Sequence, residues 1–370
     1  MKICFICTEI FAWDKFGGFG RVTRTIGREL VKRGIEICAV VPRQKVQESY
    51  EILDGMKVFG FSKSNPFTAE EILVKCNADI YHSEEPSFIT YLAMKILPEK
   101  IHLVTSRDPR TITDWKLEFL YPSANILQVF TNFIFENNFL VSRAVRKAAK
   151  VFYTAKFLEE KVKQKYRLIK PADFLPTPIW IPQKKIIKSD SPLVCFIARI
   201  DRRKRPEIFF RLAKIFPEIK FIVVGKSRSI NFENSLRKKY ENLKNLEITG
   251  FINQFENNRI SEILEKSWVL VNPSVREGLP NSFLEALAHK CAILSSVNPE
   301  NIVEKFGFYV KDDDFAAGLN NLLTNNNWKK KGEDGQRYVI ENYELDYTIE
   351  KHIKIYKEVL KINEKEQIII

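Results

Sequence analysis

The sequence is poor in cysteine and histidine, and it has no long apolar run. Its 370 residues include six cysteines and four histidines. No apolar run approaches the roughly 18 residues that a membrane-spanning helix needs. The run near the start, in MKICFICTEI, is also too short for a signal-peptide core and predicts a strand. These absences argue against a membrane-spanning protein and a secreted one.

The cysteines also argue against a zinc site. Cys4 and Cys7 form a CxxC pair, but their side chains point to opposite faces if the segment is a strand. No second pair completes the four ligands of a structural zinc site. We therefore expect all six cysteines to be reduced, mostly buried thiols in a cytosolic protein.

Composition and charge limit the class further. Hydrophobic residues make up 45% of the chain and charged residues 28%, which excludes a disordered or collagen-like protein. The net charge is +13, and the basic excess is spread over both halves of the chain. Such an excess favours anionic partners, namely phosphates, anionic lipid headgroups or nucleic acid.

Apolar strands alternate with amphipathic helices along the first half. A strand over 2–7 is followed by a glycine-rich turn at 17–20 and by a helix with Val22, Ile26 and Leu30 on one face. Further strands are predicted at 35–41, 79–82, 102–106 and 151–155. Strands alternating with helices indicate a parallel sheet covered on both faces.

A proline-rich segment near residue 176, LPTPIWIP, divides the chain. A second series follows, with strands predicted at 193–198, 220–225, 246–250, 269–272 and 292–296 and helices at 207–216, 231–240 and 281–290. Helices at about 314–324, 328–342 and 346–363 close the chain. We therefore expect two doubly wound α/β domains with C-terminal helices, facing across a cleft lined by their strand-end loops.

The most informative segment is NPSVREGLPNSFLEALA, at 272–288. A strand enters a loop and the loop enters a helix, with Asn281 or Ser282 as the expected N-cap. Free N–H groups at such a helix start bind phosphate or sugar oxygens. Glu277 and Glu285 can both face this helix start and accept paired hydroxyls. The plainer interpretation makes them a surface loop charge and a solvated helix residue.

This segment resembles the E-x7-E motif of the family 4 glycosyltransferases of the GT-B fold. GGFGRVTRTIGRELVKRG is similar to the family's glycine loop and first helix, and ARIDRRKRP to its Arg-x4-Lys loop. DIYHSEEP, VTSRDPR, IVVGKS and EITGFI fall where the family has its strand ends. The resemblance implies a Rossmann-like acceptor-side domain at 1–178, a linker at 179–192 and a nucleotide-sugar domain at 193–345. A last helix at 346–370 would cross back to the first domain.

The resemblance implies a role for each matching residue. Arg199 and Lys204 match the cations that hold the donor diphosphate, whose developing charge fixed cations stabilise. Glu277 matches the donor-sugar carboxylate, so Arg199, Lys204 and Glu277 are the expected catalytic residues. Glu285 matches the ribose carboxylate. Backbone groups complete the expected donor site, at Gly18, Gly278 and Leu279. A solvated basic loop at 199–205 and a simple tight turn at 17–20 are the competing interpretations.

The chain departs from the family on the acceptor side. Arg107 stands before Asp108 where the family usually has a histidine, and Glu84 replaces a second histidine near His82. His82, Arg107 and Asp108 are therefore acceptor-side candidates, and a buried structural histidine is the alternative for His82. The triple aspartate at 312–314 fits an acidic turn before a helix better than a metal site. We expect no metal and no other cofactor.

A basic stretch at 142–170 bears on partners and localisation. It holds ten lysines and arginines against two glutamates, with apolar residues interleaved. A peripheral contact with an anionic membrane at the cytoplasmic face is one interpretation, and a solvated helix face is the other. The expected partners are a nucleoside-diphosphate sugar and a glycan or lipid-linked acceptor, without nucleic acid.

The resulting prediction is a retaining, metal-independent glycosyltransferase. A nucleotide-sugar 2-epimerase of the same architecture is the alternative. A dinucleotide-dependent oxidoreductase is disfavoured, because Thr23 stands where the fingerprint needs a third glycine and no acidic residue follows the second strand.

Overall fold

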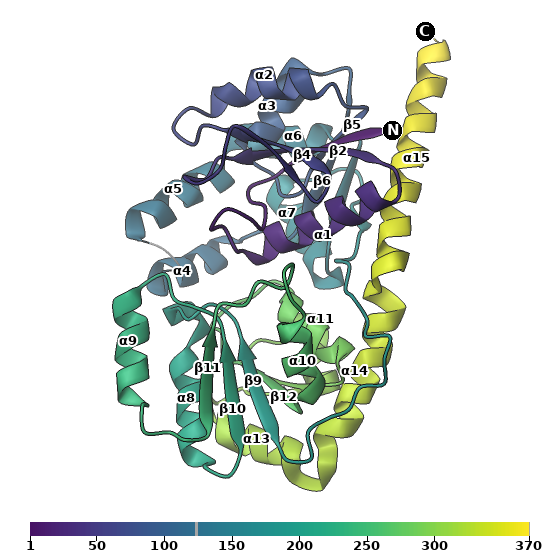
Figure 1. The fold of residues 1–370 in the computed structure, drawn as a ribbon. Coiled ribbons are helices and arrows are strands. Elements are labelled where there is room, and N and C mark those ends of the chain that lie inside the picture. The colour runs from purple at the N-terminus through teal and green to yellow at the C-terminus, as the bar shows by residue number, and fades with distance from the viewer. Residues whose placement is uncertain (123–124, 370) are drawn as a thin grey trace. The chain divides into compact units, whose positions relative to one another are not determined.

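The computed structural model describes residues 1–122 and 125–369 (Figure 1). The chain divides into two compact units. The first unit comprises Met1–Thr111, Phe130–Pro178 and Leu345–Ile370, and the second comprises Ile112–Val129 and Ile179–Glu344. Residue 370, the last of the predicted C-terminal helix, lies outside the described residues. Each unit has its own sheet and its own hydrophobic core.

The first unit is built on an eight-stranded sheet in the order β3-β4-β2-β1-β5-β6-β7-β8. All neighbouring strands run parallel except β3 and β4, which form an antiparallel hairpin. The strands are β1 (Lys2–Ile6), β2 (Glu36–Pro42), β3 (Tyr50–Leu53), β4 (Met56–Phe61), β5 (Ile80–Ser83), β6 (Ile101–Ser106), β7 (Lys150–Tyr153) and β8 (Asp173–Phe174). β1, β5 and β6 are central, so their carboxyl ends lie side by side.

Helices flank this sheet. They are α1 (Gly18–Lys32), α2 (Ala69–Cys76), α3 (Phe88–Ile96), α6 (Phe139–Lys147), α7 (Glu159–Tyr166) and α15 (Leu345–Ile369). α1 shows why the sequence folds this way, since Val22, Ile26 and Leu30 form one buried face as predicted. α15 packs against α1 and supplies Ile349, Ile353 and Tyr356 to the core of the first unit.

The second unit has a six-stranded, fully parallel sheet in the order β11-β10-β9-β12-β13-β14. Its strands are β9 (Leu193–Ile197), β10 (Lys220–Val224), β11 (Leu246–Gly250), β12 (Val269–Asn272), β13 (Ala292–Ser295) and β14 (Gly307–Tyr309). Its helices are α4 (Ile112–Leu120), α8 (Pro206–Ile215), α9 (Ile230–Lys239), α10 (Arg259–Lys266), α11 (Asn281–Ala288), α12 (Ile302–Phe306), α13 (Phe315–Leu323) and α14 (Asn327–Tyr343). α5 (Ile126–Glu136) carries the chain from the second unit back into the first.

The longer segment of the second unit, Ile179–Glu344, begins and ends at adjacent points. Ile179 and Glu344 form a parallel bridge, and the Ile179 amide donates to the Tyr343 carbonyl at 2.7 Å. The segment after Ile179 stays on this unit, where the Lys188 ammonium donates to the carbonyls of Leu264 and Ser267. Residues 179–192 are thus held by hydrogen bonds to the second unit.

The predicted fold class is confirmed, with two parallel-sheet α/β domains and C-terminal helices. All six cysteines are free and buried, as expected. The strands β3, β4, β8 and β14 were not predicted, because they are short and lack a long apolar run. The helices α2 to α7, α10 and α12 were not predicted either. The basic stretch at 142–170 is divided among α6, β7 and α7. Within the described residues, no helix is long and apolar enough to cross a membrane.

Candidate functional site

The basic loop after β9 is folded tightly onto the second unit. Asp201 accepts a hydrogen bond from the Lys204 amide at 3.1 Å, which caps a single turn at Arg202–Lys204. Arg205 then adopts a left-handed conformation, with φ of 45°, and Pro206 opens α8 as its first residue. The turn therefore fixes where each basic side chain of the loop points.

Most cations of this loop lie beside carboxylates of the same unit. The Arg199 guanidinium lies 3.3 Å from Asp201, and that of Arg203 lies 2.9 Å from the buried carboxylate of Glu118. The Arg205 guanidinium donates hydrogen bonds to both carboxylate oxygens of Asp313, at 2.7 and 3.0 Å. Lys204 pairs with Glu277, and Arg202 is exposed. The loop is thus an ordered set of ion pairs. Its acidic partners Glu118 and Asp313 were not predicted as such, because nothing in the sequence links them to this loop.

Two of the predicted site residues, Lys204 and Glu277, form an ion pair in the structure. Their side chains are 13% and 12% exposed. The Ser274 hydroxyl donates to the same Glu277 oxygen at 2.8 Å, and the Val275 amide donates to the Arg203 carbonyl at 3.0 Å. The loops after β9 and β12 are therefore joined into one polar surface at the carboxyl end of the sheet.

The Glu277 carboxyl is ionised in this setting. Burial alone would raise its pKa, but the charges of Lys204 and Arg203 and the hydrogen bonds from Lys204 and Ser274 lower the pKa to about 2. The pair therefore presents a fixed carboxylate and a fixed ammonium to any ligand that reaches this loop.

The start of α11 differs in one detail from the prediction. The prediction of Asn281 or Ser282 as the N-cap is wrong, because the cap position is Pro280, which makes no side-chain cap bond. Proline fixes its own φ and keeps the preceding residue extended, so the helix begins directly after it. Gly278, Leu279 and Glu285 are half-buried around this helix start, with Glu285 in the second turn. The predicted donor residues of the second unit thus lie on two neighbouring loops and one helix.

Only glycine fits at position 225 without a steric clash. Gly225 directly follows β10 and has a φ of 146°, and a Cβ at this position would lie 1.9 Å from the Ala198 carbonyl oxygen. Its amide donates to the Gly250 carbonyl at 2.9 Å. The glycine allows the ends of β9, β10 and β11 to converge beside the basic loop.

The glycine turn of the first unit holds a carboxylate. Gly17 caps α1, and the Gly20 amide donates to the Glu9 carboxylate at 3.0 Å. A Cβ at Gly17 would lie 1.9 Å from the same oxygen, so the glycine makes room for Glu9. Gly18 is exposed. An anionic group, the Glu9 carboxylate, therefore lies at this helix start, where the helix dipole favours negative charge.

His82 and Arg107 are interior residues of the first unit. The two ring nitrogens of His82 lie 2.8 Å from the hydroxyls of Tyr356 and Thr105, and burial lowers its pKa to about 4. Arg107 pairs with Glu84, and both side chains are nearly inaccessible. Burial alone would raise the pKa of Glu84, but the charge of Arg107 lowers it below its usual range. Asp108 is half-buried next to them.

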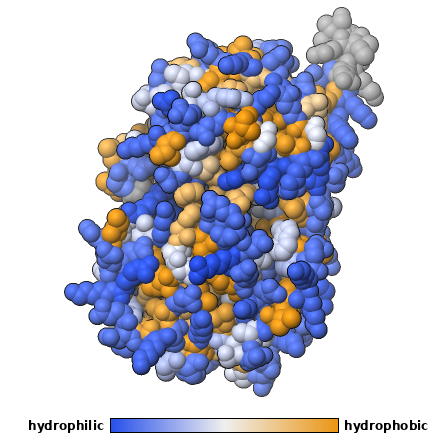
Figure 2. All heavy atoms as spheres, in the orientation of Figure 1, coloured by the Kyte–Doolittle hydropathy of each residue, from blue (hydrophilic) through white to orange (hydrophobic). Residues whose placement is uncertain are grey.

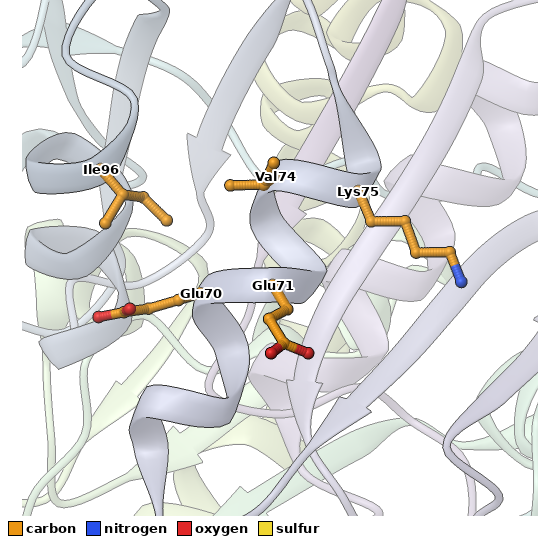
Figure 3. Close-up of a pocket in the computed structure, with 5 residues that line it drawn as sticks. All are labelled: Glu70, Glu71, Val74, Lys75 and Ile96. Atoms are coloured by element: carbon orange, nitrogen blue, oxygen red, sulfur yellow. The ribbon is translucent and has the colours of Figure 1, made fainter.

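Two other features do not join these sites. A shallow groove between α2 and α3 is lined by Glu70, Glu71, Val74, Lys75 and Ile96, none of which is a predicted site residue (Figure 3). Asp314 caps α13 through the Ala317 amide at 2.9 Å, which confirms the acidic turn before a helix. Across residues 1–122 and 125–369, no group of three or more His, Cys, Asp and Glu side chains could hold a metal ion.

Comparison with family models decides the class. Residues 180–344 match the model described as glycosyl transferases group 1, and residues 2–98 match the starch synthase catalytic domain. Residues 180–344 are thus similar to the group 1 glycosyl transferases, and the whole chain has the GT-B fold. The first match spans Arg199, Lys204, Glu277 and Glu285. The second spans Gly18 and His82 but stops before Arg107 and Asp108.

Known proteins agree with this class. A curated relative, the Escherichia coli UDP-Gal:alpha-D-GlcNAc-diphosphoundecaprenol alpha-1,3-galactosyltransferase, is 29% identical over 147 residues, which is 37% of each chain. The match therefore spans little more than a third of that relative's length. Sucrose-phosphate synthase from Thermosynechococcus elongatus has the same fold, with a TM-score of 0.74 at 14% identity, covering 98% of this chain and 99% of that chain. Anabaena HepE in complex with UDP and glucose has a TM-score of 0.71 at 11% identity, covering 96% and 99%.

Proposed function

We propose that the chain transfers a sugar from a nucleoside-diphosphate sugar to a hydroxyl acceptor, with retention of configuration and without a metal ion. The observation that carries this proposal is the Lys204–Glu277 pair, held at a strand end beside the start of α11. A lysine ammonium has three N–H donors, so Lys204 can bind Glu277 and a phosphate oxygen together. The exposed part of Arg199 supplies a second cation.

These groups suit a leaving nucleoside diphosphate. Negative charge grows on its phosphates as the glycosidic bond breaks, and fixed cations stabilise that charge without reorganising. Arg199 and Lys204 take this role in the proposal, and the amides near Gly278 and Leu279 add hydrogen bonds. Glu277 accepts hydroxyls of the donor sugar and Glu285 those of the ribose, since ionised carboxylates are pure acceptors.

The proposed nucleotide is uridine diphosphate. The curated relative is named for a UDP-galactose donor, and the Anabaena HepE structure holds UDP and glucose. Thermal-shift binding of UDP, GDP, ADP and NAD to the wild type and to Glu285→Ala tests the donor site. We expect UDP alone to stabilise the wild type and the substitution to remove the effect. Stabilisation by no diphosphate would contradict the donor-site assignment.

Stereochemistry and metal independence need a separate measurement. Product formed from a UDP-sugar is examined by NMR, before and after prolonged treatment with EDTA. The expected product keeps the anomeric configuration of the donor, and chelation leaves the rate unchanged. An inverted product would overturn retention, and a rate restored only by added Mg²⁺ or Mn²⁺ would overturn metal independence.

The proposed acceptor is a lipid-linked sugar at an anionic membrane. The relative's name specifies a diphosphoundecaprenol-linked acceptor, and α5 carries apolar side chains suited to a bilayer. Ile126, Leu127, Phe130 and Ile134 are each half or more exposed, and α5 has no charged residue before Glu136. Apolar side chains also gather along the edge of the surface at the level of α5 (Figure 2). α6 follows with Arg143 and Lys147 exposed, which favours anionic headgroups.

Vesicle co-sedimentation tests the membrane contact. The wild type should bind vesicles that contain phosphatidylglycerol, and added salt should weaken the binding. Leu127→Asn combined with Phe130→Asn should abolish it. Ile187→Asn is the matched control, because Ile187 is 69% exposed and lies outside both α5 and the basic stretch at 142–170. Absence of salt-sensitive binding by the wild type would reject the membrane contact, and equal loss in the control variant would reject the role of α5.

A nucleotide-sugar 2-epimerase is the alternative function. It would use the same donor groups but need no acceptor. Incubating the chain with a UDP-sugar alone and following the sugar ring by NMR separates the two. A new epimer formed without acceptor would favour the epimerase.

A further inference from the structure

The carboxyl ends of β5 and β6 in the first unit carry a second group of charged side chains. Glu85 follows β5 by two residues, and Asp108 and Arg110 follow β6. β5 and β6 are paired in parallel, with Ser83 opposite Val104, so these loops leave the sheet as neighbours. The position is the ligand-binding edge of a parallel sheet.

Two helices of the same unit complete the group. Glu136 ends α5, and Lys165 and Tyr166 end α7. The Glu136 carboxylate lies 3.6 Å from the Arg110 guanidinium and 4.0 Å from the Lys165 ammonium. Both cations therefore face Glu136. Among the residues that the structure describes, no cation forms an ion pair with Glu85.

Glu85 is held by the backbone. One of its oxygens, Oε2, accepts a hydrogen bond from the Arg107 amide at 2.8 Å. The side chain is half-buried, so the carboxyl is both positioned and within reach of solvent. Glu84, its neighbour, is buried and paired with the Arg107 guanidinium. Of these two adjacent glutamates, Glu85 is therefore the one that a ligand can touch.

The surroundings keep Glu85 protonated near neutral pH. Burial raises its pKa to about 8, with the Arg107 amide and Lys165 opposing the rise and Glu136 and Asp108 adding to it. Arg110 faces Glu136, and Tyr166 is buried beside the group with its own pKa raised by burial and by Glu85. A protonated carboxyl both donates and accepts a hydrogen bond, which matches a sugar hydroxyl.

We propose that Glu85 contacts the acceptor sugar through its carboxyl, while the Arg107 amide holds that carboxyl in place. The inference rests on the proposed sugar transfer and names a residue of its acceptor side. It assigns the contact to a residue next to the predicted candidates His82 and Arg107, whose side chains point into the core.

Steady-state kinetics test the assignment, with a UDP-sugar as donor and an alkyl-linked N-acetylglucosaminyl diphosphate as acceptor. Glu85→Ala should raise the acceptor KM about tenfold, the loss expected for one hydrogen bond in a shielded site. The donor KM should stay unchanged. Glu85→Gln should keep most of the activity, since an amide also donates and accepts. Glu99→Ala is the control, an exposed carboxylate near the amino end of β6.

The pH profile separates contact from a structural role. The wild-type acceptor KM should change as the pH rises through about 8, when Glu85 loses its proton, and the Glu85→Gln profile should be flat there. An unchanged acceptor KM in Glu85→Ala, or the same pH profile in Glu85→Gln, would overturn the assignment. Failure of the wild type to transfer to this acceptor would instead overturn the proposed acceptor class, and the role of Glu85 with it.

Discussion

The strand-end charges of the two units are arranged differently. In the second unit, Lys204 and Glu277 are each about one-eighth exposed and lie on loops. In the first unit, Glu84 and Arg107 are 2% and 5% exposed and lie against a neutral, buried His82. Both pairs follow parallel strands at the edge where ligands bind. Position along a strand therefore does not by itself make a charge part of a binding site.

The difference follows from what covers each pair. Lys204 and Glu277 are fixed by hydrogen bonds within their own loops, to Asp201 and from Ser274. Both side chains stay partly exposed, so they can form further hydrogen bonds with a ligand. In the first unit α15 reaches the strand ends, and its Tyr356 hydroxyl bonds to His82. We therefore expect the accessible pair, Lys204 and Glu277, to bind ligands, and the covered pair, Glu84 and Arg107, to stabilise the fold.

The largest expected effect is on stability, from breaking the covered pair. Arg107→Met leaves the Glu84 carboxylate buried without its cation, and such losses cost about 3–5 kcal/mol. Urea denaturation measures the free energy of unfolding. The double variant Glu84→Gln/Arg107→Met should lose much less, because it removes both charges. A stable Arg107→Met protein that has lost transfer would show that Arg107 meets a substrate after all.

The accessible pair should act on rate. Lys204→Met removes a cation beside the proposed diphosphate, and loss of such a stabilising group typically lowers kcat by about 10²–10³. Arg202→Met is the matched control, since Arg202 is exposed in the same loop. Equal rate losses in the two variants would mean that the loop contributes only general positive charge.

Much of this architecture could be predicted from the sequence. The central strands are continuous apolar runs bounded by turn residues, which is why β1, β2, β9 and β10 were placed within a residue or two. The pairing of Lys204 with Glu277 was within reach as well, because both lie in motifs of the same domain. The hairpin of β3 and β4 could not be predicted in this way, since β3 is partly exposed and Lys57 interrupts the apolar residues of β4.

What could not be predicted depends on long-range packing. Whether Glu84 or Glu85 faces outward is decided by contacts with Arg107, Glu136 and Lys165, which are far away in sequence. The burial of His82 depends on Tyr356, which lies 274 residues later. The N-cap of α11 shows a local limit, because Asn281 and Ser282 are better caps by type than the proline that precedes them.

We expect a smaller loss of stability when the hydroxyl of either of two buried tyrosines is removed. Tyr356→Phe in the first unit leaves a His82 nitrogen without its hydroxyl partner, which should cost about 1–3 kcal/mol of unfolding free energy. Tyr343→Phe in the second unit should cost only about 0.5–1.5 kcal/mol of unfolding free energy. The Glu300 carboxylate that loses the Tyr343 hydroxyl still accepts a hydrogen bond from the Tyr338 hydroxyl at 2.9 Å. Denaturation curves of both variants test this order. A larger loss at Tyr343 would mean that the covered network of the first unit is not the more tightly coupled one.

The smallest effect is an expected absence of pH dependence at the accessible pair. The pKa of Glu277 is lowered to about 2, so the carboxylate stays charged at neutral pH and the Lys204 pair weakens only as the pH falls from about 4 towards 2. Calorimetric binding of an intact UDP-sugar, whose phosphates do not titrate in this range, should therefore be constant from about pH 5 to about pH 8. The acceptor KM should vary over the upper part of the same range through Glu85. A donor affinity that changes near neutral pH would place a different titrating group at the accessible pair, and the contrast between the two units would then rest on exposure alone.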